Sequence, residues 1–167
     1  KHYGDASKLD EISNNIENIK SDYSAVDIVI LKQMHGNNII DTDITNYHNY
    51  PEADGAITTQ KNLILSVLTA DCVPVIFTSK VGDVIGVAHC GWRSAKANII
   101  SNINNSMKTR GAKDIKAIIG PSILQESYEV DSDFYKDFIN DDISYKNLFI
   151  TSKNSGKHMF DLSGYVK

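Results

Sequence analysis

Two apolar segments separated by a short polar turn constrain the fold of this chain most strongly. Residues 73–77 and 84–89 are rich in β-branched side chains, and the sequence Lys-Val-Gly-Asp at 80–83 between them is typical of a turn. This pattern predicts an antiparallel hairpin between residues 73–78 and 84–89. If the hairpin closes at residues 81–82, Cys72 and His89 lie on adjacent strands near its open end.

The remaining segments predict a mixed α/β protein. Apolar residues recur at helical spacing in residues 8–20, which predicts an amphipathic covering helix. A second helix is predicted from Trp92 to about 107–110, with Gly111 as its stop, and a third is capped by Asp131. Strands are predicted at residues 26–31, 39–40, 56–59, 63–68, 115–119 and 158–162.

Two of the predicted strands carry more specific expectations. Residues 63–68 are almost continuously apolar, which predicts a strand covered on both faces. Pro74 cannot donate a hydrogen bond to a neighbouring strand, so an edge strand or a bulge is expected around it.

Composition and charge narrow the functional classes. The 17 Lys and Arg residues against 21 Asp and Glu give a net charge of −4 without a long basic cluster, which argues against nucleic acid as a partner. No apolar run reaches the roughly 18 residues of a membrane-spanning helix. We therefore expect a single soluble, cytoplasmic domain over residues 1–167, a monomer or homodimer, whose two cysteines stay reduced.

Cys72 and His89 offer a thiolate and an imidazole, a pair that suits zinc better than magnesium or calcium. Cys90 follows His89 directly, so strand alternation turns it to the opposite face. His35 lies at another strand end and is the best remaining third ligand, although a lone histidine beside Gly36 is more often an exposed turn residue.

One cysteine and two histidines would leave one position of a tetrahedral zinc ion open, which is typical of catalytic zinc and predicts hydrolytic or group-transfer chemistry. Asp71, next to Cys72, could shuttle protons in such a site. It could equally cap a turn or orient a metal ligand.

Arg93 is one of only two arginines in a chain with 15 lysines. It stands in the first turn of the helix predicted after His89, where free backbone amides favour an anion such as phosphate. Its planar guanidinium suits bidentate anion recognition. The alternative is an ordinary ion pair with a surface carboxylate.

Several short motifs, in order along most of the chain, resemble the polyphenol oxidase or laccase-domain family. They are Gln33-Met34-His35-Gly36, Asp54-Gly55, Thr69-Ala70-Asp71-Cys72-Val73-Pro74-Val75, Ala88-His89-Cys90-Gly91-Trp92-Arg93, Gly120-Pro121-Ser122-Ile123 and Tyr128-Glu129-Val130. His2-Tyr3-Gly4-Asp5 and Phe160-Asp161-Leu162 resemble further blocks of the family. Family members usually run longer at both ends, so the resemblance implies that this chain is incomplete there.

The resemblance implies a layered α/β/β/α sandwich with mixed, largely antiparallel sheets. It also implies a zinc site, which falls on His35, Cys72 and His89 of this chain. The implied activities are phosphorolysis of adenosine, inosine and methylthioadenosine, with purine nucleoside and phosphate as partners, and deamination of adenosine. Asp71 and Arg93 are the expected catalytic residues, and Gln33 and Arg93 are expected to bind substrate.

Two other functions remain as alternatives, namely a copper-dependent polyphenol oxidase and a metal-binding module without catalysis. A multicopper oxidase needs a blue-copper centre and a histidine-rich cluster, whereas this chain has five histidines. Cys90 and Ser94 stand where the family commonly has alanine and glycine, and Cys90 could alter metal selectivity if it turned inward.

Overall fold

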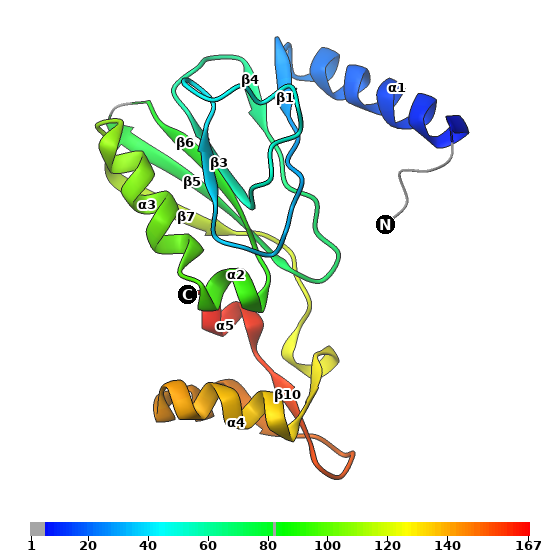
Figure 1. Ribbon diagram of the computed structural model, residues 1–167, viewed down its shortest axis with the longest axis vertical. Helices are drawn as coiled ribbons and strands as arrows, with labels where there is room; N and C mark the ends of the chain where they lie inside the picture. Colours follow the sequence, from blue (N-terminus) through cyan, green and yellow to red (C-terminus); the bar gives the residue numbers. More distant parts are fainter. Residues whose placement is uncertain (1–5, 82) are drawn as a thin grey trace.

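A five-stranded sheet forms the centre of the structure (Figure 1). The computed structural model describes residues 6–81 and 83–167, so the motif at residues 2–5 and the turn residue Gly82 lie outside the described residues. The strands follow the order β2 (Ile39–Asp41), β3 (Gly55–Thr58), β6 (Ile85–Cys90), β5 (Val73–Val81) and β7 (Lys113–Ile119). Strands β2 and β3 are parallel, and all other neighbours in this sheet are antiparallel. The pairing of β5 with β6 confirms the predicted hairpin.

The expectation of an edge strand or a bulge at Pro74 is wrong. Strand β5 lies between β6 and β7, and its pairing with β6 runs without interruption. The carbonyl oxygen of Pro74 accepts a hydrogen bond from the Gly120 backbone nitrogen, so the polar side of this residue faces the end of β7. Regular pairing with β7 begins only at Val75 and Ile119, so no ladder bond needs the missing N–H of the proline.

Two smaller sheets accompany the central one. Strands β1 (Asp27–Val29) and β4 (Leu63–Leu65) pair in parallel, and β8 (Glu129–Asp131), β10 (Lys157–Phe160) and β9 (Phe149–Thr151) form an antiparallel sheet in that order. The predicted strand at 158–162 therefore ends at Phe160, because Asp161 caps the next helix by accepting a hydrogen bond from the Gly164 nitrogen.

The prediction of a fully covered strand at residues 63–68 is also wrong, because β4 ends at Leu65 and Leu68 is exposed. The partner strand β1 ends at Val29, whose carbonyl oxygen accepts hydrogen bonds from the backbone nitrogen and the hydroxyl of Ser66. Beyond this point a side chain replaces the missing strand, since the amide of Gln33 bonds to the backbone nitrogen and oxygen of Leu68.

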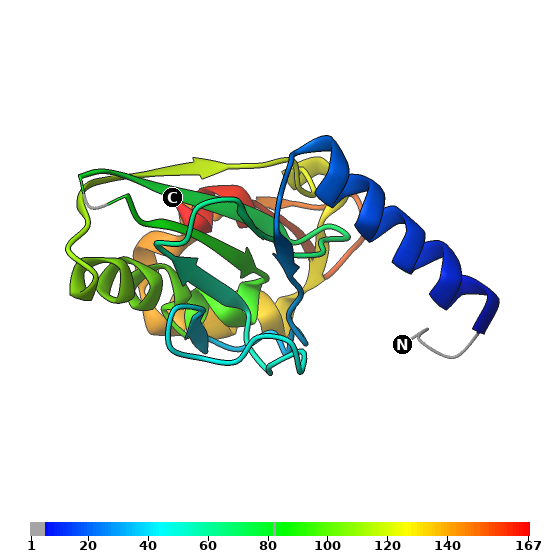
Figure 2. The same cartoon turned by 90° about the horizontal axis from the view of Figure 1, so that it is seen from above.

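The predicted helices are present, with one correction. Helix α1 (Ala6–Asp22) extends away from the body of the molecule (Figure 2), and α4 (Ser132–Asp141) is capped by Asp131 as expected. The helix predicted from Trp92 is divided into α2 (Trp92–Lys96) and α3 (Ile99–Thr109). Asn98 breaks it by adopting a left-handed conformation with φ 65°, which asparagine tolerates better than most residues. The short helices are α5 (Leu162–Val166) and the 3-10 turns η1 (Gln125–Ser127) and η2 (Ile143–Leu148).

The helices and sheets pack in layers. Helix α3 covers one face of the central sheet through Ile99, Ile103 and Met107, in a core that continues to Phe138 and Phe160 of the lower part of the molecule (Figure 1). The other face packs against the β1–β4 pair in a second apolar cluster, and α1 contacts β1 outside that pair. This arrangement confirms the expected mixed α/β class with largely antiparallel sheets. Within the described residues, no helix combines the length and the apolar composition needed to cross a membrane.

Candidate metal centre

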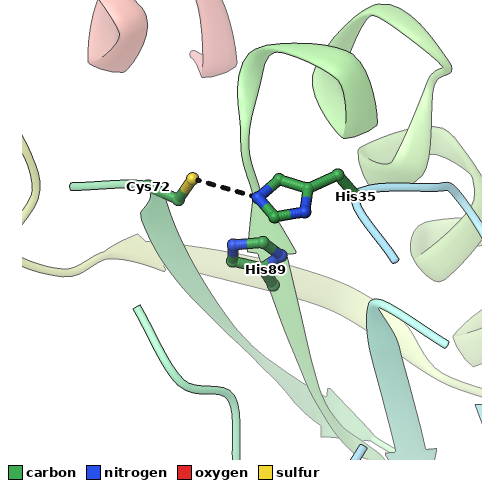
Figure 3. A group of neighbouring side chains, drawn as sticks. All are labelled: His35, Cys72 and His89. Atoms are coloured by element: carbon green, nitrogen blue, oxygen red, sulfur yellow. Dashed lines mark hydrogen bonds between the residues drawn. The ribbon is translucent and has the colours of Figure 1, made fainter. Parts of the chain in front are cut away.

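The three predicted metal ligands meet at the open end of the hairpin (Figure 3). His35 comes from the loop before β2, Cys72 immediately precedes β5, and His89 is in β6. One potential ligand atom from each residue lies within 4.8 Å of the other two. Cys72 Sγ is 4.0 Å from His35 Nε2, and the two imidazole rings stand edge to face with centroids 4.8 Å apart.

The hairpin register explains why Cys72 and His89 converge. Pro74 is paired with His89, so Cys72 lies just beyond the paired residues, at the end where β6 leads into Gly91. Cys90 points to the opposite face, into the apolar core, as strand alternation predicted. Burial raises the pKa of the Cys90 thiol to about 12, with further contributions from Cys72 and Asp54, so this cysteine remains a protonated core residue at neutral pH.

Asp54, which precedes β3, connects the two histidines. Its carboxylate accepts backbone hydrogen bonds from Met34, His35 and Gly36 at 3.1, 2.9 and 2.8 Å. It also lies 2.8 Å from Nδ1 of His89. Asp54 and His89 are both buried. One buried acid therefore organises the loop that carries one ligand and the ring of another.

The charges of this pair follow from those contacts. Burial alone would lower the pKa of His89, but the hydrogen bond to Asp54 and then the proximity of Cys72 raise it to about 9. Burial alone would raise the pKa of Asp54, but the bonds from His89 and from the three backbone amides outweigh it and lower that pKa. Without metal, the pair is thus an imidazolium and a carboxylate at neutral pH, and metal binding must release a proton.

His35 is held in an unusual backbone conformation. Its φ is 58°, in the left-handed region that costs a residue other than glycine about 1 kcal/mol or more. The three backbone bonds to Asp54 stabilise this turn and direct the His35 ring toward Cys72.

Gly91 permits the close approach of the ligands. A Cβ atom at this position would lie 3.0 Å from Cδ2 of His35 and 3.1 Å from Sγ of Cys72. Because such contacts are tighter than ordinary van der Waals packing, a larger residue would push the two ligands away from one another.

The residues present fit a thiophilic metal ion. Two imidazole nitrogens and one thiolate form a donor set suited to zinc or copper. Nitrogen and sulfur ligands of a tetrahedral zinc ion stand about 3.5 Å apart, so the 4.0 Å between Cys72 and His35 needs only a small closure.

Arg93 is exposed and lies two residues after Gly91, the glycine that adjoins His35 and Cys72. Its guanidinium carbon lies 4.5 Å from the centre of the Trp92 ring, and Trp92 packs edge to face against Phe134 of α4. Among the residues that the structure describes, no carboxylate lies within ion-pair distance of Arg93, which removes support from the surface ion-pair alternative. The sequence predicts a long helix that starts here, but α2 has only five residues. The end of so short a helix is a weak anion site, so Arg93 itself is the main candidate for anion binding.

Asp71 and Gln33 flank the cluster in different ways. Asp71 is exposed, has φ 80°, and accepts a hydrogen bond from the Ile123 nitrogen through its carbonyl oxygen. The Gln33 amide is engaged with both backbone groups of Leu68, so it joins the loop of His35 to the segment that leads to Cys72. A catalytic role for Asp71 and a substrate contact for Gln33 stay predictions.

Comparison with known proteins identifies the relatives of this chain. A family model described as multi-copper polyphenol oxidoreductase laccase matches residues 1–167. The chain belongs to this laccase family. The family resemblance expected from the motifs is thereby confirmed.

Curated relatives of this chain carry a different activity in their names. A purine nucleoside phosphorylase from Rickettsia prowazekii is 50% identical over 157 residues, covering 94% of this chain and 65% of the relative. A purine nucleoside phosphorylase from Aquifex aeolicus is 37% identical over 110 residues, covering 66% of this chain and 48% of the relative. The chain thus spans less than two thirds of the length of these curated relatives.

Solved structures share the fold. A Neisseria meningitidis protein superposes with a TM-score of 0.83 at 25% identity, covering 99% of this chain and 66% of the other. YlmD from Geobacillus stearothermophilus superposes with a TM-score of 0.74 at 26% identity, covering 99% of this chain and 65% of the other.

Sequence reasoning assigned no role to Asp54, which the structure places at this centre, or to Tyr128, whose pKa responds to the charge of Cys72. Asp54 is the only charge in the apolar run Ala53-Asp54-Gly55-Ala56-Ile57, and a buried charge needs partners, so a signal for it existed. The pKa of Tyr128 is raised, first by burial and then by the charge of Cys72. The charge of Arg93 acts to lower this pKa, and the charge of Asp71 acts to raise it. No spacing in the sequence pointed to this interaction.

Proposed function

We propose that this chain carries the zinc centre of a purine nucleoside phosphorylase that acts on adenosine, inosine and methylthioadenosine and also deaminates adenosine. The observation that supports it most is the meeting of His35, Cys72 and His89 within 4.8 Å, with Arg93 two residues after Gly91 and without an ion-pair partner among the described residues. The names of the relatives point to the same reaction. Because those relatives are longer, the activity is proposed for the whole protein of which these residues form the metal centre.

His35, Cys72 and His89 would hold the metal, with Nε2 of His89 as the ligand because Nδ1 is bonded to Asp54. Bound there, zinc supplies a Lewis acid with one open coordination position. The remaining chemistry belongs to the surrounding side chains.

Arg93 is proposed to bind the phosphate that attacks C1′ of the ribose. Its guanidinium is stacked on Trp92 and free of carboxylate partners among the described residues, so its donors are available to an incoming anion. Trp92 is itself fixed by Phe134, which limits the conformations that the arginine can adopt.

Asp71 is proposed to move a proton during deamination, because its exposed carboxylate lies in the residue next to Cys72. Tyr128 is half-buried with its ring packed edge to face against Phe160, and its hydroxyl is proposed to orient the substrate.

The test is product formation by the zinc-loaded, full-length protein. With adenosine and inorganic phosphate, adenine and ribose 1-phosphate are expected, and with adenosine alone inosine is expected. His35→Gln should abolish both, whereas the control His48→Gln should retain them because His48 is exposed, faces Asp27 and is not one of the three clustered residues. Folded, zinc-loaded protein that releases neither product would overturn the proposal.

A copper-dependent polyphenol oxidase is the second candidate, because the family description names copper chemistry. In residues 6–81 and 83–167, His35, Cys72 and His89 are the one cluster suited to a metal, whereas a multicopper oxidase needs several. More than one copper ion per chain, together with oxygen uptake in the presence of a phenol, would favour this candidate. A fourth protein ligand that closed the centre would instead favour a non-catalytic metal-binding module.

A further inference from the structure

The Asp54 carboxylate divides four donors between its two oxygens. Oδ1 accepts from the His35 backbone nitrogen and lies 2.8 Å from Nδ1 of His89. Oδ2 accepts from the backbone nitrogens of Met34 and Gly36. Both oxygens therefore face N–H groups, and the side chain of Asp54 is buried, so water cannot replace either acceptor.

This arrangement determines which nitrogen of His89 is free. A carboxylate can only accept hydrogen bonds, so its contact with Nδ1 keeps the proton on that nitrogen. The lone pair of the neutral ring is then on Nε2, the nitrogen left for a metal ion. The backbone bond from the His89 nitrogen to the Asp54 carbonyl oxygen, 2.7 Å long, holds the two residues in register.

We propose that Asp54 is a positioning residue of the metal centre, which selects Nε2 of His89 as the ligand atom and fixes the left-handed turn that presents His35. The proposal rests on the metal site of the proposed function, but it concerns metal binding and not the nucleoside reaction. The proposal implies that loss of the Asp54 charge changes the positions of two metal ligands at once, His35 and His89, although they come from separate segments.

An isosteric amide makes the proposal testable. In Asp54→Asn, an NH₂ group in place of Oδ2 would face two backbone N–H groups. In place of Oδ1 it would face only one, from His35, and it could donate to Nδ1 of His89. The second orientation costs less, and it favours the ring proton of His89 on Nε2, which must lose that proton before it can bind a metal.

The experiment measures zinc affinity by competition with a chromogenic chelator, and the absorption of the cobalt(II)-substituted protein, without any nucleoside. Asp54→Asn should weaken zinc binding by about 10- to 100-fold and change the cobalt spectrum. The matched control is Asp43→Asn, which removes a carboxylate that also accepts several hydrogen bonds but contacts no histidine. Its zinc affinity should stay within about twofold of the wild type.

A second measurement uses the wild-type protein, so the proposal stays testable even if Asp54→Asn does not fold. Long-range proton–nitrogen correlation spectra of the imidazole rings should show a proton on Nδ1 of His89 in the zinc-loaded protein. A zinc-bound Nδ1, or a folded Asp54→Asn variant with wild-type zinc affinity and cobalt spectrum, would overturn the proposal. Wild-type protein that binds zinc in this way but turns over no nucleoside would refute the proposed function and leave the role of Asp54 intact.

Discussion

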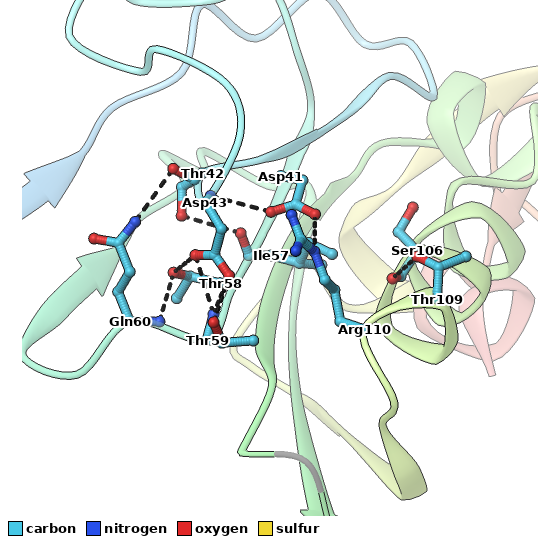
Figure 4. A network of polar contacts seen from close by, with 10 residues as sticks. All are labelled: Asp41, Thr42, Asp43, Ile57, Thr58, Thr59, Gln60, Ser106, Thr109 and Arg110. Atoms are coloured by element: carbon cyan, nitrogen blue, oxygen red, sulfur yellow. Dashed lines mark hydrogen bonds and ion pairs between the residues drawn. The ribbon is translucent and has the colours of Figure 1, made fainter.

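Two aspartates hold the opposite ends of strand β3 and serve different purposes. Asp54 precedes the strand, is buried, and bonds to the His35 turn and to His89. Asp43 lies at the far end, where it accepts hydrogen bonds from the hydroxyl of Thr58 at 2.9 Å and from the backbone and hydroxyl of Thr59 (Figure 4). Each carboxylate ties a loop to the sheet, but only one of them contacts a candidate metal ligand.

The number of hydrogen bonds does not separate the two sites, and neither does the direction of the pKa shift. Burial acts to raise the pKa of Asp43, yet the bonds from Thr59 and Thr58 lower it overall, as the His89 and backbone bonds do for Asp54. The difference lies in the donors. Threonine hydroxyls and backbone amides that donate to a carboxylate have no second group for binding a metal ion. A histidine that donates through one ring nitrogen keeps the other nitrogen free to bind a metal ion.

The largest expected effect is the loss of stability in Asp54→Ala. The substitution leaves three backbone amides and a buried imidazole without their acceptor, which should lower the free energy of unfolding by about 3–5 kcal/mol. Asp43→Ala should cost only about 1 kcal/mol because Thr59, which supplies two of the three donor groups, is exposed to water. Urea unfolding of the metal-free proteins measures both, and equal losses would show that burial does not distinguish the two sites.

Gly91→Ala should affect the metal more than the fold. The added methyl group would press on His35 and Cys72 at 3.0 and 3.1 Å, so zinc affinity should fall at least tenfold while stability falls by about 1–3 kcal/mol. Gly36→Ala is the matched control, because its Cβ would meet only the Asp54 carboxylate at 3.7 Å, an ordinary contact. Chelator competition on both variants measures the difference, and unchanged zinc affinity in Gly91→Ala would count against the site geometry.

Above neutral pH, the pH dependence of stability should differ between variants of Asp54 and variants of Asp43. The pKa of His89 is raised from 6.5 to about 9, so its contribution is complete below about pH 6.5 and disappears as the pH rises through 9. The pKa values of Asp54 and Asp43 are lowered, so their contributions are present above about pH 4 and are lost in more acidic solution.

Unfolding midpoints of the metal-free protein between pH 5 and 10 should therefore decline above neutrality. This decline should be reduced in Asp54→Ala, which removes the main cause of the raised His89 pKa, and preserved in Asp43→Ala. An identical alkaline profile in both variants would contradict the Asp54–His89 pairing.

The smallest expected effect concerns Arg110, which pairs with Asp41 beside the Asp43 network (Figure 4). Because both side chains are partly solvated, Arg110→Lys should leave the unfolding midpoint almost unchanged at physiological salt. Zinc affinity should be that of the wild type. A change in metal binding would reveal coupling between the two ends of β3 that the contacts do not predict.

Local sequence patterns were sufficient for the hairpin and for two of the ligands. Alternating and apolar runs located β5 and β6, and the turn between them fixed the register that brings Cys72 to His89. The third ligand was different, because the position of His35 depends on the bonds of its turn to Asp54, a residue that lies 54 − 35 = 19 positions further along the chain. Its spacing carries no local signal, so the family resemblance was needed to favour it over an ordinary turn histidine.

The elements that were predicted incorrectly also depended on distant contacts. Residues 66–68 have the composition of a strand, but the Gln33 side chain occupies the backbone groups of Leu68. The helix after Gly91 has no proline or glycine to interrupt it, yet it breaks at Asn98, whose neighbour Ala97 accepts a hydrogen bond from the Asn37 side chain through its carbonyl oxygen. In both places a side chain from the loop containing His35 replaces a bond that regular secondary structure would have made.

The spacing of the candidate ligands along the chain also has a consequence for metal binding. The ligand residues are spread over 89 − 35 = 54 positions, and their common anchor, Asp54, immediately precedes β3. A nascent chain therefore has no local pair of ligands with which to capture an ion, in contrast to a zinc finger. The three ligands come together only when β5 has paired with β6 and the His35 turn has bonded to Asp54, so metal binding requires these parts of the tertiary structure.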